Sequence, residues 1–484
     1  MAGSAAACDS QPMWAALPTF DIRRCAFRPT LALCAAAVAA LCAVRLAAQE
    51  PPPTPEPAPA AAAEPEERST GLPKPFAWTF NFDAGVGTFG FANSLYANVR
   101  PDPSGDLSDN WSESFVKPAL SATYDLGDSE LYGKLSAVGE RTFGVPPSEV
   151  VGEEASSFQI EDLNLGWRSG TSLGASKDLL EVYGGRAQYR IGHGFLLWDG
   201  AGEGGSRGGF WSNARKAWEL AGVVRVKPGP HTFEAFYLDR DEVPESETGV
   251  DLWGANYELA LGEATTLGVT YLDVSANPAK KPLRNGLEAI NARAFTAPFS
   301  GLPDLSFELE YALEDNGDLM RSEAWTAQAA YQLSGVAWKP KITYRYAFFE
   351  GDDPATAKSE SFDPLFPGFY DWGTWWQGEI GGEYFLANSN LLSNMVRVHV
   401  SPNDKIGAGL ITFLFELDHP EALGPGVTAQ DVMIEFDAYC DWKLNDNFIL
   451  SIVGAYGNPR QAVEQAFGRT DNFTYGMLYL AYSY

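Results

Sequence analysis

Residues 338–368, WKPKITYRYAFFEGDDPATAKSESFDPLFPG, give the clearest indication of the fold. The first half alternates apolar and polar residues. One face would hold Trp338, Pro340, Ile342, Tyr344, Tyr346 and Phe348, and the other Lys339, Lys341, Thr343, Arg345 and Ala347. A period of two predicts a β-strand with one apolar and one polar face, which a soluble sheet could also have. An acidic turn, residues 350–354, and an aromatic-proline run, residues 362–367, then predict a long structured loop.

The same alternation continues from Phe76 to the C-terminus and marks about 18 segments of about ten residues, the length of a tilted membrane strand. They centre near residues 82, 120, 136, 163, 185, 222, 235, 256, 270, 291, 309, 327, 343, 395, 411, 436, 451 and 479. No window holds the ~18 consecutive apolar residues of a helical span. Connections after even-numbered segments are mostly short, and those after odd-numbered segments mostly long, a regularity that a soluble β-sandwich has no reason to keep.

The predicted fold is therefore all-β: a single antiparallel transmembrane β-barrel of about 18 strands, with short periplasmic turns and long extracellular loops. In lipid, only a closed barrel satisfies the backbone N–H and C=O groups of strands. Residues 374–386 (TWWQGEIGGEYFL) are assigned to the longest outer loop, because another strand there would make the strand count odd.

The N-terminal 48 residues have the layout of an export signal. Arg23, Arg24 and Arg28 precede an apolar core at residues 30–44, and small residues precede Gln49. This core is shorter than the ~20 residues of a membrane-spanning helix, so we favour a signal peptide, residues 1–48, over a membrane anchor. Residues 49–74, rich in Pro, Ala and Glu, predict a disordered periplasmic linker, and residues 75–484 the barrel.

Charge and cysteine content exclude several functions. The net charge is -29, and without residues 1–48 the balance is 30 basic against 61 acidic side chains, or -31. Nucleic-acid binding requires a basic face, so nucleic acid is not expected as a partner. Four of the five cysteines lie in the leader, which leaves Cys440 without an intramolecular disulfide partner. Neither a cofactor nor a metal site is predicted.

The stretch from the acidic GDDP turn to FDPLFPG resembles the signature loop of the alginate-export family of outer-membrane β-barrels. A second similarity covers residues 182–198 and 212–221, which resemble the family's "GRQ" strand, glycine-rich loop and returning strand. Here the motif is Gly185-Arg186-Ala187-Gln188, one residue longer. The resemblance spans roughly residues 75–484 and implies a conduit in the outer membrane of a Gram-negative bacterium, in contact with lipid and lipopolysaccharide.

In that family, lumen-lining arginines hold the carboxylates of an anionic polyuronate, and a planar guanidinium suits this role. The corresponding lumen residues here are Arg168, Arg186, Gln188, Arg190, Arg293, Lys341, Arg345 and Arg397. The loop residues expected to constrict the lumen are Asp352, Asp353, Phe362, Asp363 and Phe366. The alternative is that each arginine pairs with a neighbouring lumen acid, since lumen faces of such barrels are polar by default.

Acidic side chains on the same polar face argue against a polyanion. Glu435, Asp437 and Asp441 are among many acids predicted to face inward, and they would raise the barrier to an anionic chain. The sequence predicts a passive channel for a hydrophilic solute or polysaccharide. The first alternative is a general or solute-specific porin that favours cationic or neutral solutes.

A second alternative is an outer-membrane enzyme or adhesin that acts on glycans. The four histidines lie in no HExxH motif and beside no GxSxG motif, so no catalytic residue is predicted. The last residues, 477–484 (MLYLAYSY), resemble the assembly signal of outer-membrane proteins, which implies recognition by the barrel-assembly machinery.

Overall fold

The computed structural model describes residues 75–93, 109–144, 146, 155–174, 176–368, 377–468 and 470–484. The signal peptide and linker predicted at residues 1–74 lie outside the described residues. Among the described residues, no helix has the length and apolarity of a membrane-spanning helix.

Eighteen strands form one antiparallel sheet, as predicted, and each expected segment centre falls within a strand. The strands are β1 (Phe76–Ala92), β2 (Asp109–Asp125), β3 (Glu130–Gly144), β4 (Ser156–Arg168), β5 (Leu180–Ala187), β6 (Trp218–Val226), β7 (His231–Asp239), β8 (Asp251–Leu261), β9 (Thr265–Ser275), β10 (Leu287–Thr296), β11 (Leu305–Asn316), β12 (Met320–Gln332), β13 (Lys341–Phe349), β14 (Leu391–Asn403), β15 (Ile406–Glu416), β16 (Asp431–Lys443), β17 (Phe448–Pro459) and β18 (Phe473–Ser483).

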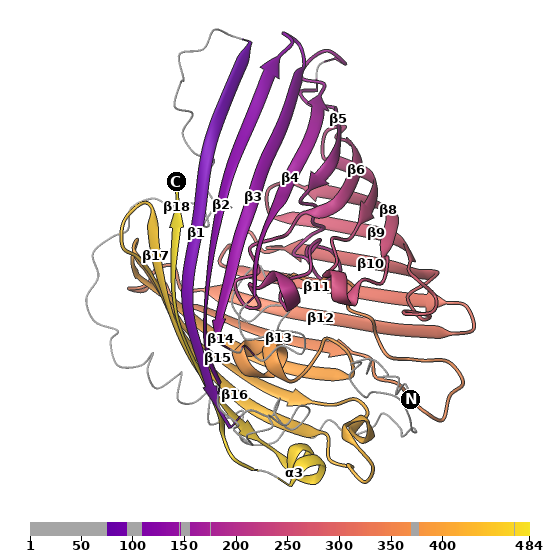
Figure 1. The fold of residues 1–484 in the computed structure, drawn as a ribbon, viewed down its shortest axis with the longest axis vertical. Coiled ribbons are helices and arrows are strands. Elements are labelled where there is room, and N and C mark those ends of the chain that lie inside the picture. Colours follow the sequence, from indigo (N-terminus) through magenta and orange to yellow (C-terminus); the bar gives the residue numbers. More distant parts are fainter. Residues whose placement is uncertain are drawn as a thin grey trace, which may run out of the picture.

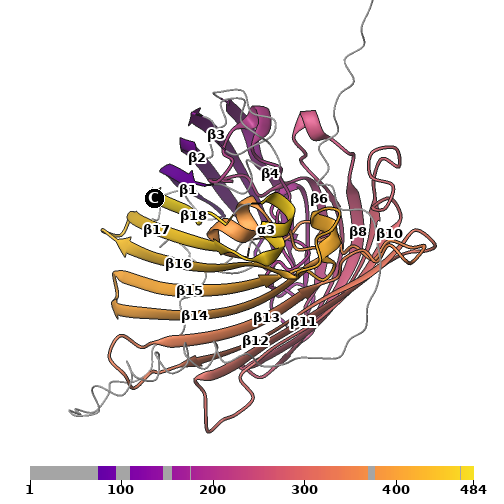
Figure 2. The same cartoon turned by 90° about the horizontal axis from the view of Figure 1, so that it is seen from below.

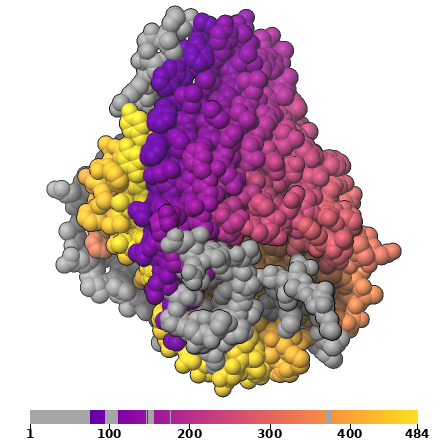
Figure 3. Space-filling view, viewed as in Figure 1, coloured from indigo at the N-terminus to yellow at the C-terminus, as the bar shows by residue number. Residues whose placement is uncertain are grey.

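The sheet closes into a barrel because β1 pairs with both β2 and β18. Strands β1–β4 run side by side along the wall (Figure 1), and β18 lies directly beside β1 on the surface (Figure 3). Closure leaves no unpaired sheet edge, which a lipid environment requires. The fold class predicted from the alternation is confirmed.

The outer face of the barrel is apolar. Phe158, Leu165 and Leu410 are 72%, 65% and 64% exposed. Exposure of such large apolar side chains is unfavourable in water but favourable in the hydrocarbon of a membrane. On β13, Tyr344 is exposed on this face, whereas Arg345 is buried inside the barrel. The predicted inward and outward phases of β13 therefore hold.

Two predicted strand extents are wrong. Trp338 and Lys339 have φ of 67° and 41° and lie in the β12–β13 turn, so β13 begins only at Lys341. Gln188 and Arg190 lie beyond the end of β5 at Ala187, because the chain leaves the sheet there and enters the next loop. The long-loop pattern also has an exception, since residues 317–319 alone connect β11 to β12.

In the part of the chain that the structure describes, five short helices lie in the connections that follow odd-numbered strands. They are η1 (Gly205–Arg207), η2 (Pro244–Ser246), the π-helix η3 (Gly378–Gly382), η4 (Pro420–Leu423) and α3 (Gln461–Phe467). Helix α3 marks the end of the barrel from which the long loops extend (Figures 1 and 2). The described part of residues 374–386 lies in the β13–β14 connection and includes η3, so its assignment to a loop is confirmed.

Candidate channel constriction

Two long loops fold into the lumen and pair with each other there. We call residues 188–217 the β5–β6 loop and residues 350–390 the β13–β14 loop. The amides of Trp198 and Asp199 donate to the Phe366 carbonyl at 2.9 and 3.1 Å, and the Phe366 amide donates to the Leu196 carbonyl at 2.9 Å. These backbone bonds join the two loops inside the barrel.

The β5–β6 loop also reaches the opposite wall. The ring of His193 stacks on Phe295 of β10 with 4.1 Å between centroids, and its Nδ1 lies 3.1 Å from a carboxylate oxygen of Glu308 on β11. The loop therefore spans the lumen from β5 to β11 and narrows it.

Carboxylates on three successive strands anchor the β5–β6 loop through its backbone amides. Glu113 on β2 accepts from Ser212 N–H at 2.8 Å, and Glu161 on β4 accepts from Lys216 N–H at 2.7 Å. Glu140 on β3 accepts from Ala214 N–H at 3.3 Å. Hydrogen bonds to charged groups are roughly twice as strong as neutral ones, so these inward acids fix the loop.

Glu435 on β16 has the same role for the β13–β14 loop. Its two carboxylate oxygens accept from Ile380 N–H at 2.8 Å and from Gly381 N–H at 2.7 Å. Gly378, with φ of 95°, is required at this contact because a Cβ there would lie 2.6 Å from a Glu435 oxygen. The motif GEIGG thus forms a tight turn of backbone donors around one buried acid.

Two cavities lie between the loops and the barrel wall. The outer cavity, about 510 Å³, is lined by both loops and by Arg240, Glu242 and Ser246 of the β7–β8 connection. The inner cavity, about 260 Å³, is lined by both loops and by strands β15–β18. Asn213 and Glu383 line both cavities, so the two spaces adjoin at this pair. We define the constriction by these two residues.

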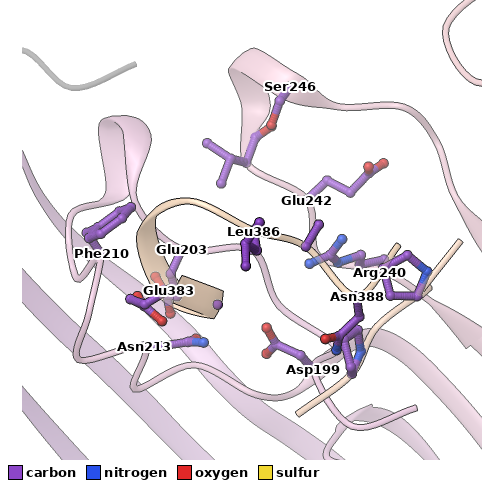
Figure 4. Close-up of a pocket in the computed structure, with 16 residues that line it drawn as sticks. Asp199, Glu203, Phe210, Asn213, Arg240, Glu242, Ser246, Glu383, Leu386 and Asn388 are labelled. Atoms are coloured by element: carbon purple, nitrogen blue, oxygen red, sulfur yellow. The ribbon is translucent and has the colours of Figure 1, made fainter. Parts of the chain in front are cut away.

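Acidic side chains outnumber basic ones at the constriction. The outer cavity is lined by Asp199, Glu203, Glu242 and Glu383 against Arg240, and the inner by Glu379, Glu383 and Asp437 against Lys216. In Figure 4, Glu203, Glu383 and Asn213 lie on one side of the outer cavity and Arg240 and Glu242 on the other. An excess of carboxylates in a narrow passage concentrates cations and repels anions.

Two of these loop carboxyls have raised pKa values. Burial, and then the charges of Glu435 and Asp441, raise the pKa of Glu379 to about 8. Burial, and then the charges of Glu379 and Glu113, raise the pKa of Glu383 well above its usual range, although Lys216 opposes this shift. Glu379 therefore loses its proton only at neutral to alkaline pH, and Glu383 keeps its proton to a higher pH than an ordinary glutamate does.

We expect cation preference to rise with pH. Glu379 is mostly neutral at pH 6 and mostly ionised at pH 9, because its pKa is about 8. A unit charge about 6 Å from a passing ion contributes about 0.7 kcal/mol in water, or about threefold in local cation concentration. Reversal potentials across a KCl gradient at pH 6 and pH 9 measure the change. In Glu379→Gln, the difference in reversal potential between pH 6 and pH 9 should be smaller. If the variant keeps the full difference, Glu379 is not the group responsible for it.

The structure places most of the predicted lumen cations in contact with other groups. Arg168 pairs with Glu181 at 3.0 Å, Arg293 with Glu258 at 2.6 Å, and Arg186 with Asp241. Arg345 contacts Gln377 at 3.3 Å, and Arg397 contacts the Tyr439 hydroxyl at 2.9 Å. Arg190 lies 4.4 Å from the ring of Trp198, and Gln188 and Lys341 are exposed. These residues do not form a continuous row of available positive charge.

The predicted loop residues lie in the lumen, but they act within the loop rather than as free charges. Asp352 and Asp353 accept backbone N–H groups of Glu360 (2.9 Å) and Ala355 (2.8 Å). Asp363 pairs with Arg284, and these contacts lower the pKa of Asp363 against the opposing effect of burial. The ring of Phe362 packs 5.9 Å from Phe349.

Phe366 lies at the centre of the packed loops. Its ring meets Trp218 edge-on at 5.4 Å, and the guanidinium of Arg240 lies 4.6 Å above it. The contacts of the Phe366 ring with Trp218 and Arg240 stabilise this loop conformation over others. The aromatic-proline run thus stabilises the packed arrangement of the two loops.

Sequence reasoning missed the loop anchors Glu113, Glu140 and Glu161, and it missed Asp241. It placed Glu435 on the inner face, but alternation gives only the direction of a side chain and not its partner. No local signal links these acids to loop amides that lie 55 to 99 positions away. The described residues contain no group of three or more His, Cys, Asp or Glu arranged to hold a metal ion.

Comparison with known proteins agrees with this architecture. A family model described as alginate export matches residues 286–421, which include the FDPLFPG stretch, and confirms the resemblance inferred from that stretch. The Acinetobacter baumannii OccAB1 structure superposes with a TM-score of 0.54 and 11% identity, covering 84% of this chain and 96% of that chain. Pseudomonas aeruginosa OccK8 (OprE) gives 0.53 and 10%, covering 84% and 98%. Such low identities establish similarity of fold only. No curated protein sequence matches the chain.

Proposed function

We propose that this alginate-export-like channel of the Gram-negative outer membrane conducts small hydrophilic solutes and prefers cationic or neutral ones. One observation supports the proposal above all: carboxylates dominate the lining where the two cavities adjoin. The predicted arginines would favour anions, but Arg168, Arg186 and Arg293 are neutralised by ion pairs. Selection would be steric and electrostatic, with no covalent step.

The test is ion selectivity. Purified protein in a planar bilayer across a KCl gradient should give a reversal potential that indicates K⁺ preference at pH 9, where Glu379 is mostly ionised. Preference for Cl⁻ would contradict the proposal.

Conduction of a polyuronate is the second candidate, and the family match at residues 286–421 favours it. It predicts anion preference that falls in Arg186→Ala and Arg345→Ala. In our proposal these variants keep cation preference, because Arg186 is already paired with Asp241 and Arg345 contacts Gln377. The two candidates therefore differ in the sign of the reversal potential.

We further infer that residues 1–48 direct export and that residues 49–74 form a periplasmic linker. The alternating β18, which ends in aromatic residues, supports recognition by the barrel-assembly machinery. The apolar outer face supports contact with lipid and lipopolysaccharide. Deletion of residues 477–484 should reduce the heat-modifiable, folded form on gels if β18 is the assembly signal.

A further inference from the structure

The inner cavity combines an apolar wall with carboxylates. Trp211, Ile411, Val453 and Tyr479 line one part of it, and Glu379, Glu383 and Asp437 add three acidic groups. The rings of Trp211 and Tyr479 lie against each other with 5.2 Å between centroids. Carboxylates beside aromatic and aliphatic surface match an organic cation, whose charge and carbon atoms need different surroundings.

Asp437 is the acid in this cavity that most clearly needs a partner. Its side chain is 3% exposed, and neither carboxylate oxygen makes a hydrogen bond of normal geometry with any described residue. Glu435, two positions earlier on the same strand face, uses its oxygens to anchor the β13–β14 loop. A buried carboxyl group without a cationic partner is costly to ionise and tends to keep its proton. A positive group from solution would therefore stabilise the ionised form of Asp437.

The protein itself does not supply that positive group. Among the described residues that line the inner cavity, Lys216 is the one cationic side chain. Its ammonium group lies 3.3 Å from Asp199 and is ion-paired there. A metal ion is also a poor fit, because no described group of three or more His, Cys, Asp or Glu is arranged to bind one.

We propose that the inner cavity binds the ammonium group of a small organic cation, with Asp437 as the principal counter-ion. Glu379 and Glu383 add negative charge from the β13–β14 loop, and Trp211 and Tyr479 contact the carbon atoms of the solute. The site rests on the proposed cation-preferring channel and adds to it a solute class and a binding position. Binding also favours the ionised forms of Glu379 and Glu383, so affinity should rise with pH.

The experiment compares choline with its uncharged isostere 3,3-dimethyl-1-butanol as blockers of the KCl current through the purified channel. Choline should reduce the current in a saturable way, and the isostere should have little effect. Asp437→Asn should weaken choline block by at least about tenfold, as expected for loss of a charge-assisted contact. Because Asp437 forms no ion pair with any described residue, this variant should still assemble, as heat-modifiability on gels will show.

Asp441→Asn is the matched control. It removes the same charge from the same face of β16, lies outside the cavity lining, and keeps an oxygen acceptor for the Ser451 hydroxyl. It should change choline block by no more than about twofold, because its effect is only a screened long-range field.

Several results would overturn the site. Equal weakening by Asp437→Asn and Asp441→Asn would mean that a general acidic field attracts choline, and the cation preference would stand without a site. Equal block by choline and the isostere, or no block by choline, would also reject it. Cl⁻ preference of the unmodified channel would instead reject the proposed function itself, so the two failures are distinguishable.

Discussion

Asp241→Asn is expected to raise the single-channel conductance and to lower the stability of the folded channel. Asp241 lies in the β7–β8 connection and is the shared counter-ion of three arginines. Its carboxylate pairs with Arg186 at the end of β5 and with Arg207 and Arg215 of the β5–β6 loop. No other described acid contacts all three.

The expected size follows from burial. The side chains of Arg207 and Arg215 are 5% and 0% exposed. Asparagine would leave Arg207 without its carboxylate partner and Arg215 with only Glu161, at 3.6 Å. Removing one partner of a buried ion pair costs about 3–5 kcal/mol. In this variant the charges of Arg207 and Arg215 are more favourably hydrated if the β5–β6 loop moves out of the lumen. That movement would widen the constriction.

Conductance in KCl and exclusion of neutral sugars of increasing size measure the widening, and urea titration of the folded form measures the stability. Asp239→Asn is the control, because it removes the same charge two residues earlier, at the end of β7, without an ion pair to these arginines. Unchanged conductance and sugar exclusion in Asp241→Asn would show that the arginine cluster does not hold the loop.

Glu435→Ala is expected to release the β13–β14 loop and to admit larger solutes. The carboxylate accepts two backbone N–H groups from η3, at 2.8 and 2.7 Å. Each hydrogen bond to a charged group contributes about 1.5–3 kcal/mol, and alanine removes both. The unpaired amides would then be stabilised by hydrogen bonds to water, so η3 is expected to move away from the barrel wall.

A graded series makes this prediction sharper. Glu435→Gln keeps one acceptor oxygen, so its conductance should lie between those of the unmodified protein and Glu435→Ala. Asp441→Asn removes a charge further along β16 without touching an anchor and should leave sugar exclusion unchanged. If Glu435→Gln and Asp441→Asn change conductance and sugar exclusion equally, the effect comes from the loss of charge and not from the loss of the anchor.

The resemblance at residues 338–368 pointed to the family whose model matches residues 286–421, because its motif is local. The acidic turn and FDPLFPG follow each other along the chain, and Asp353 and Asp352 accept hydrogen bonds from amides two and eight positions away. Local hydrogen bonds and turn chemistry are visible in sequence. The ends of the strands could not be predicted as well. The apolar–polar alternation continues through Gln188 and Arg190, although β5 ends at Ala187.

The functional role of the lumen charges could not be predicted in the same way. Alternation places Arg293 and Arg345 on the inward face, where both are buried, and it equally places Glu435 and Asp437 there. It did not say which charges cancel. Arg186 meets an acid 55 positions away, and Glu113 meets loop amides up to 99 positions away.

The sequence by itself therefore determined the strands, their two faces and the closed barrel, because a period of two and the demands of lipid on the backbone act locally along the chain. Only the tertiary structure decided the character of the constriction. There, strand register and loop docking bring distant residues together, so that arginines are neutralised, Glu113 and Glu435 become loop anchors, and Asp437 lines the inner cavity. Pairing of charges depends on distances in space, and these are set only when the barrel closes and both loops fold into its lumen.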